Sequence, residues 1–173
     1  MPRVHVHARE GLALSTPAPI VETLELVAAT KGGGLKPWMR RGLTLQVLRS
    51  LSFAWRERET GRLVAAGGFY PLPPAEPGEE HAETWFLCRP DLGGNMLEFV
   101  RLARLTHRRA AEYGPVRLSA TVREGHRPGQ RLARLLAYRR LDVVNGYELW
   151  EWRSERICPD DLRGHVAERA PGG

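Results

Sequence analysis

The chain is poor in lysine, and this shapes how its positive charge is carried. Lys31 and Lys36 are the only lysines among 26 basic residues, which outnumber 20 Asp and Glu and give a formal net charge of +6. The charge is therefore carried almost entirely by arginine. A positive charge favours acidic partners such as nucleic acid, phosphate-bearing cofactors or acidic protein surfaces, without choosing among them.

Cysteine is also scarce, and long hydrophobic runs are lacking. Cys88 lies in an apolar segment and Cys158 lies near the C-terminus; two cysteines are too few for a secreted disulfide framework, so we expect free thiols. No stretch approaches the roughly eighteen apolar residues of a membrane span, and the first seven residues lack the apolar stretch of a signal peptide. We therefore expect a cytoplasmic protein with no membrane partner.

Several catalytic signatures are missing as well. The sequence has no Gly-x-Ser-x-Gly elbow, no Walker loop and no paired-carboxylate pattern. His5 and His7 would share one face of a strand, but no cysteine or acidic motif nearby completes a metal site, so we expect no metal. Cys88 and His107 could serve as nucleophile and base, yet a cysteine in so apolar a strand is usually inert core.

What is present predicts a folded chain with an ordered succession of elements. The length and an apolar content of 42% suit a single domain over residues 1–173, with 154–173 as a C-terminal tail. Residues 71–80, rich in proline and acid, predict an exposed loop, and the apolar run at 84–88 predicts a central strand. Periodicity and turn residues predict a strand at 4–7, helices between Pro17 and Gly32 and from Pro37, strands at 52–58, 63–70 and 84–88, a helix at 95–113, a strand at 116–122, a helix at 128–138 and a hairpin at 141–152 turning at Asn145-Gly146.

This order resembles the GCN5-related N-acetyltransferase (GNAT) superfamily across nearly the whole chain. Within it, four segments look like divergent GNAT-like proteins found among structural genes of tailed phages and prophages. These segments are Phe53–Arg56, Gly61–Gly68, Trp85–Asp91 and Ser119–Tyr138. The resemblance implies an α/β (α+β) fold, with a central mixed but mostly antiparallel sheet flanked by helices.

The resemblance also implies a site for acetyl-CoA. In the family, the third strand of the central meander splays from its neighbour, and the pantetheine arm lies in the gap. The pyrophosphate binds backbone amides where the long helix begins, as the helix dipole favours. The residues that the resemblance assigns to the cofactor are Phe86, Leu87, Cys88, Arg89, Gly93, Gly94 and Asn95.

The phosphate loop departs from the family pattern of Arg or Gln, two residues, Gly, one residue, then Gly or Ala. Leu92 stands where the first glycine belongs, although Gly93 and Gly94 follow. Asp91 would repel a pyrophosphate unless Arg89 or a helix amide takes up its charge. An ordinary turn into a helix explains the two glycines equally well.

Acetyl transfer to an amine needs a base for the amine proton and an acid for the departing thiolate. Many relatives use a glutamate on the meander, and the resemblance points to Glu83, next to the third meander strand, as the catalytic base. The plainer interpretation of Glu83 is a solvated residue that ends the acidic loop at 79–83.

The acid is harder to place. Relatives use a tyrosine on the helix after the fifth strand, and a Gly-Phe pair commonly closes that helical segment. If residues 137–138 match this pair, the acid position falls at Ala133, which cannot donate a proton, and the family's usual asparagine falls at His126. Tyr138 is then interpreted as a core or rim aromatic.

Two arginine stripes could hold phosphates of a cofactor or of nucleic acid. Their plainer interpretation is solvated helix faces, since Glu98 and Glu112 interrupt the first stripe. The stripes comprise Arg101, Arg104 and Arg108 on the long helix, and Arg127, Arg131 and Arg134 around the next one.

Three hypotheses follow for the function. The first is an acetyl-CoA-dependent transferase acting on an unknown amine. The second is an inactive phage-derived GNAT-fold protein that is a structural or interaction component of a virion or its assembly, which Leu92 and Ala133 favour. The third, a nucleic-acid-binding module, rests on charge alone. An enzyme needs the gap open, whereas a scaffold can fill it with side chains such as Trp85 or Met96.

Overall fold

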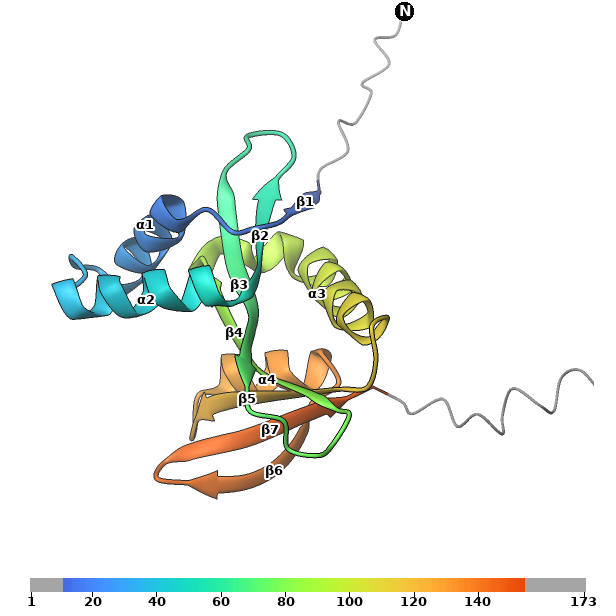
Figure 1. The fold of residues 1–173 in the computed structure, drawn as a ribbon. Coiled ribbons are helices and arrows are strands. Elements are labelled where there is room, and N and C mark those ends of the chain that lie inside the picture. The colour runs from blue at the N-terminus through green and yellow to red at the C-terminus, as the bar shows by residue number, and fades with distance from the viewer. Residues whose placement is uncertain (1–10, 155–173) are drawn as a thin grey trace, which may run out of the picture.

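A computed structural model describes residues 11–154, which form one seven-stranded sheet with helices on both faces (Figure 1). The strand order is β1-β2-β3-β4-β5-β7-β6. Neighbouring strands are antiparallel except β4 and β5, which are parallel. The predicted fold class, a mixed and mostly antiparallel sheet flanked by helices, is confirmed.

The elements match most of the order that the sequence predicts. Along the chain they are β1 (Leu12–Ser15), α1 (Ile20–Lys31), α2 (Pro37–Arg49), β2 (Leu51–Glu57), β3 (Leu63–Leu72), β4 (Glu80–Cys88), the 3-10 helix η1 (Pro90–Asn95), α3 (Met96–Ala111), β5 (Val116–Arg123), α4 (Arg127–Leu135), β6 (Arg139–Val144) and β7 (Tyr147–Arg153). Within residues 11–154, no helix combines the length and apolar character needed to cross a membrane.

Two strands differ from the prediction. The strand expected at 4–7 lies outside the described residues, whereas β1, which the sequence did not predict, pairs antiparallel with β2 and buries Leu12 completely. The loop expected at 71–80 is shorter, because β3 and β4 remain paired as far as Leu72 and His81. Glu83 is therefore a residue of β4 and not the end of an acidic loop.

The hairpin turn between β6 and β7 is confirmed. Asn145 and Gly146 have φ angles of 52° and 78°, and positive φ at both central residues is what a type I′ turn requires. Few side chains other than asparagine and glycine tolerate that conformation. The turn residues therefore fix the register of this hairpin.

The sheet buries a separate hydrophobic core on each face. The larger core, which includes Trp55, Phe99 and Leu118, lies on the side of α3 and α4. The smaller core, which includes Leu26 and Trp85, lies on the side of α1 and α2. Figure 1 shows α1 and α2 on the side of the sheet opposite α3. Side chains that alternate along a central strand therefore enter different environments.

The two parallel strands separate part of the way along. Pairing between β4 and β5 covers only Glu80–Glu83 against Val116–Ser119. Beyond that point β4 remains paired with β3, and β5 remains paired with β7. We call the gap between β4 beyond Glu83 and β5 beyond Ser119 the wedge; it opens toward the carboxyl ends of both strands and closes at these two residues.

Candidate active site

A cleft of about 270 Å³ occupies the wedge. Its wall is mostly apolar, although several lining residues carry hydroxyl or imidazole groups. The lining residues are Thr84 and Phe86 from β4, residues 120–123 from β5, and His126, Gly129, Leu132, Ala133, Leu136 and Tyr138 from α4 and its flanks. The cleft therefore follows the line along which β4 and β5 part.

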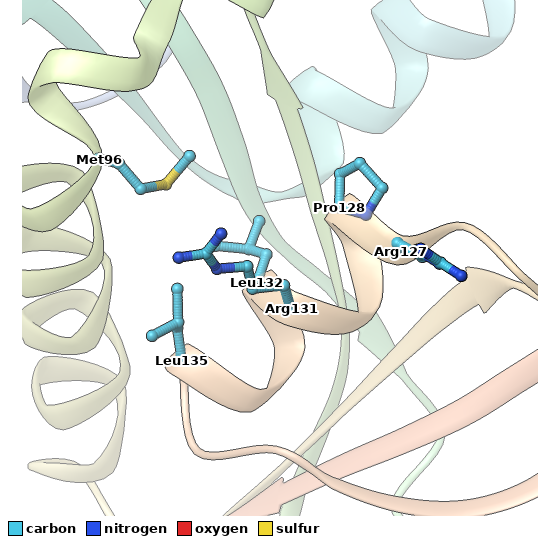
Figure 2. A pocket seen from close by; sticks show the side chains of 6 residues that line it. All are labelled: Met96, Arg127, Pro128, Arg131, Leu132 and Leu135. Carbon is cyan, nitrogen blue, oxygen red and sulfur yellow. The ribbon is translucent and has the colours of Figure 1, made fainter.

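A second cavity, of about 450 Å³, adjoins the cleft, and Leu132 lines both. We call it the groove; it lies between the start of α3 and α4 (Figure 2), and its lining residues are Met96, Arg127, Pro128, Arg131, Leu132 and Leu135. In Figure 2 the side chains of Met96 and Arg131 project toward one another across it. Both charged side chains that line the groove are arginines, so the groove suits a ligand that combines apolar and anionic parts.

The predicted phosphate loop is partly occupied by contacts within the protein. Leu92 is buried in the larger core, so the side chain that replaces the family's glycine packs inward. Asp91 pairs with Arg62 of the β2–β3 turn at 3.1 Å, and Arg89 instead donates its Nε hydrogen to the carbonyl oxygen of Leu63 at 3.0 Å. Arg62, and not Arg89, therefore takes up the charge of Asp91.

The remaining loop residues lie where the long helix begins. Gly93, Gly94 and Asn95 end η1, directly before α3, whose first residue Met96 lines the groove. A Cβ atom on Gly94 would meet no heavy atom within 4 Å. Glycine at 94 is therefore not required by a close contact within the protein.

The three β4 residues assigned to the cofactor face in different directions. Phe86 lines the cleft, whereas Leu87 packs against the smaller core on the opposite face. Cys88 packs against the larger core, and burial raises the pKa of its thiol to about 12. A thiol with that pKa stays protonated at neutral pH, which agrees with an inert core cysteine. His107 hydrogen-bonds with Tyr138 and not with Cys88.

Glu83 lies at the closed end of the wedge and is half-buried. It is the last residue of β4 to pair with β5, and its Oε1 atom accepts a hydrogen bond from the Thr121 hydroxyl at 3.5 Å. No ion pair with Glu83 occurs among residues 11–154. His81, two residues earlier on the same face, contacts the Ser119 hydroxyl through Nε2 at 2.8 Å. The carboxylate is therefore free of a cationic partner within the described fold.

A buried polar cluster, which the sequence did not predict, lies on the other face of β4. The hydroxyl groups of Thr84 and Tyr138 are 2.7 Å apart, and the Tyr138 oxygen lies 3.4 Å from Nε2 of His107. Burial lowers the pKa of His107 to about 4 and raises the pKa of Tyr138. All three side chains are therefore uncharged at neutral pH.

The segment that follows α4 brings the backbone of Tyr138 next to Ala133, the predicted acid position. Ala133, to which the resemblance assigns the acid position, lines the cleft but carries only a methyl group. Ala137 has a φ of 65°, and the amide of Tyr138 donates to the carbonyl oxygen of Ala133 at 2.9 Å. His126 caps α4 by accepting a hydrogen bond from the amide of Gly129. Tyr138 is both buried in the core and part of the cleft wall.

The structure offers no metal centre in the part of the chain that it describes. Residues 11–154 contain no group of three or more His, Cys, Asp or Glu side chains that could hold a metal ion. His5 and His7, which the sequence suggested as the start of a metal site, lie outside these residues.

Solved structures share this fold at low sequence identity. An acetyltransferase from Agrobacterium tumefaciens is 14% identical, with a TM-score of 0.60 over 85% of this chain and 92% of that one. An acetyltransferase of the GNAT family from Listeria monocytogenes is 11% identical, with a TM-score of 0.57 over 84% of this chain and 95% of that one. A domain from Methanocaldococcus jannaschii is 12% identical, with a TM-score of 0.65 over 84% of this chain and 99% of that one.

No protein-family model and no curated protein matches the sequence. The mixed seven-stranded sheet flanked by helices matches the folds of these structural neighbours. The chain has the fold of the GCN5-related N-acetyltransferases.

Proposed function

We propose that the protein is an acyltransferase that uses acetyl-CoA to acylate an amine. The observation that carries this proposal is the cleft in the wedge, which continues into a groove whose charged lining residues are arginines. A slender, polar-ended chain such as pantetheine matches the cleft, and phosphates match the groove.

The groove provides both kinds of contact that coenzyme A needs. Arg127 and Arg131 offer charge-assisted hydrogen bonds to phosphate oxygens. Met96, Leu132 and Leu135 offer apolar surface to the pantetheine arm. These α4 arginines would compensate for the phosphate loop, in which Leu92 has replaced a glycine.

Glu83 is the residue that we assign to the base role. It stands where the cleft ends, on the face of β4 that α1 and α2 cover, while the cleft lies on the opposite face. An amine that approaches from the Glu83 side would meet a thioester held in the cleft. Since Glu83 has no cationic partner in the described fold, its carboxylate can accept the amine proton.

The alternative is an inactive structural or interaction protein of phage origin, built on the same fold. Under that hypothesis the gap need not stay open. Trp85, however, faces the smaller core and donates its Nε1 hydrogen to the Ser50 hydroxyl at 2.9 Å. Met96 lines the groove without filling it. Neither side chain fills the cleft or the groove, and this favours the enzyme.

Calorimetric titration with acetyl-CoA tests the proposal. We expect micromolar binding by the unmodified protein, and weakening of about tenfold or more in an Arg127→Glu/Arg131→Glu variant, because two phosphate contacts are lost. The matched control is Arg40→Glu/Arg41→Glu, which makes the same charge change on exposed α2 residues. An Asn95→Pro variant, checked for folding by circular dichroism, removes one amide at the start of α3.

The outcomes separate the hypotheses. Binding that the groove variant loses and the α2 variant retains supports the enzyme and justifies a screen of amines. If the unmodified protein fails to bind acetyl-CoA at millimolar concentration, the proposal is wrong, and the search moves to virion or assembly proteins as partners.

A further inference from the structure

The cluster of Thr84, Tyr138 and His107 is a polar group inside an otherwise apolar core. Each side chain is less than a tenth exposed, and His107 also packs against the rings of Phe69 and Trp152. Buried polar groups are costly unless they are hydrogen-bonded, so the hydrogens of this cluster can be counted. The count leaves one donor without a protein acceptor.

The count of hydrogens begins with the imidazole ring of His107. Nδ1 of His107 is buried and has no hydrogen-bond partner among the described residues. An orphaned N–H is rarer in proteins than an orphaned acceptor, so we assign the hydrogen of the neutral ring to Nε2. The Nε2 hydrogen then points at the oxygen of Tyr138, 3.4 Å away.

The two hydroxyl groups complete the count. They bring two hydrogens to this site, and the 2.7 Å contact between them uses one. Since Nε2 of His107 acts as a donor, it cannot accept the other hydrogen. Neither hydroxyl has a further acceptor within the described fold. One hydroxyl hydrogen therefore remains for a ligand.

The cleft is the place where such a ligand would lie. Thr84 and Tyr138 both line it, and Thr84 directly follows Glu83, the last residue of β4 to pair with β5. The free hydrogen therefore lies at the closed end of the wedge. Because successive strand residues point to opposite faces, Glu83 and the hydroxyl pair would stand on opposite sides of a group bound there.

We propose that Tyr138 donates this hydrogen bond to the sulfur atom of the bound thioester, in place of the tyrosine missing from position 133. His107 and Thr84 are positioning residues, which donate to the phenol oxygen and so direct its own hydrogen into the cleft. A phenol is a stronger donor than an aliphatic hydroxyl, which is why we assign the role to Tyr138. This inference rests on the proposed function.

The chemistry balances without another reactant. The amine nitrogen forms a bond to the carbonyl carbon, the carbon–sulfur bond breaks, and its electron pair remains on sulfur. Glu83 takes the proton that the nitrogen releases, and the same net proton reaches the sulfur through solvent. Tyr138 stabilises the thiolate by hydrogen bonding and keeps its own proton, as its raised pKa requires.

The test uses coenzyme A alone, so no acceptor amine is needed. The ultraviolet absorbance of the thiolate reports the pKa of the protein-bound coenzyme A thiol. We expect that pKa to be about one unit higher in a Tyr138→Phe variant than in the unmodified protein, because a hydrogen bond to an ion is lost. Tyr113→Phe, which removes an exposed hydroxyl beyond α3, is the matched control and leaves the pKa unchanged.

Two further variants keep the test independent of the folding of Tyr138→Phe. Thr84→Val is expected to raise the bound thiol pKa by less than Tyr138→Phe does, and Thr84→Ser, which keeps the hydroxyl, leaves it unchanged. If coenzyme A does not bind, the proposed function itself fails. If it binds with the same thiol pKa in the unmodified protein and in the folded Tyr138 and Thr84→Val variants, only the present inference is wrong.

Discussion

At the scale of single residues, β4 separates two kinds of chemistry within one step of the chain. Glu83 presents a carboxylate to one face of the sheet, and Thr84 presents a hydroxyl to the other. Glu83 forms no ion pair within the described fold. A strand therefore keeps a proton acceptor and a hydrogen-bond donor apart, although they are adjacent in sequence.

The base role proposed for Glu83 leads to a prediction about rate. With any amine that the protein acetylates, Glu83→Gln should lower kcat by about 100- to 10,000-fold, because a base contributes on that order. The affinity for acetyl-CoA, measured by calorimetry, should stay within about twofold. Glu80→Gln, an exposed position of the same strand, is the control. Equal loss of rate in both variants would contradict the assignment.

His107 leads to a prediction about acid stability. Its pKa is about 4 in the folded protein and 6.5 when unperturbed, so between these values the unfolded chain binds a proton that the folded chain does not. The free energy of unfolding should therefore fall by about 3 kcal/mol as the pH drops from 6.5 to 4. Urea denaturation across this range measures it.

The comparison variant is His107→Gln, which carries no titratable group at that position. Its stability at neutral pH should be lower, since the contacts of the ring are lost, but its dependence on pH between 6.5 and 4 should be shallower. A slope as steep as that of the unmodified protein would show that other groups cause the acid sensitivity.

At the scale of elements, the sequence predicted the helices and turns whose residue pattern is local. The polar stripe of α3 and the Asn145-Gly146 turn mark their elements without reference to the rest of the chain. The start of β4 was missed because Glu80, His81 and Glu83 look like loop residues, and only pairing with β3 and β5 makes them a strand.

The candidate site divides in the same way. Glu83, Phe86 and the loop that precedes α3 could be singled out as candidates from the order of elements and the family resemblance. The hydroxyl pair could not, because Thr84 and Tyr138 are 54 residues apart and meet only once β4, α3 and the end of α4 have packed. No local pattern marks an interior contact of that kind.

Two glycines allow a prediction about β3 and α2. A Cβ on Gly67 would lie 2.5 Å from the Phe86 ring and 2.7 Å from the Trp85 carbonyl oxygen, so Gly67→Ala should destabilise the protein by about 1–3 kcal/mol. A Cβ on Gly42 would meet nothing within 4 Å in α2, so Gly42→Ala should stabilise it by about 0.5–1 kcal/mol.

Urea denaturation measures both changes under one condition. Because Gly67 lies opposite Phe86, Gly67→Ala should also weaken the binding of acetyl-CoA, whereas Gly42→Ala should not. The same sign of stability change in both variants would contradict the close packing of β3 against β4.

At the scale of the whole molecule, the sheet consists of two parts joined by a short ladder. Strands β1–β4 form one part and β5–β7 the other, and only the pairs from Glu80↔Val116 to Glu83↔Ser119 connect them. A ligand in the wedge would contact both parts. Binding should therefore be coupled to the stability of the whole fold.

This coupling predicts a ligand-dependent melting temperature. Acetyl-CoA at about 100 times its Kd should raise Tm by about 5–10 °C, as binding to the folded state alone requires. Adenosine 3′,5′-bisphosphate, which lacks the pantetheine arm, should occupy only the groove and, at the same concentration, raise Tm less. Equal shifts from the two ligands would show that the wedge is not used. Calorimetric melting curves make the comparison.

The wedge also has a consequence for what the protein excludes. Beyond Glu83, β5 does not pair with β4, so β4 presents a sheet edge in the interior of the molecule. At an outer surface such an edge invites strand addition and aggregation. Here β5 flanks it and α4 residues line the cleft beside it, so we expect these elements to keep a further β-strand from pairing with the edge. A thin chain that carries amide groups could still reach the unpaired edge of β4. The protein would then use this edge for ligand binding without promoting self-association.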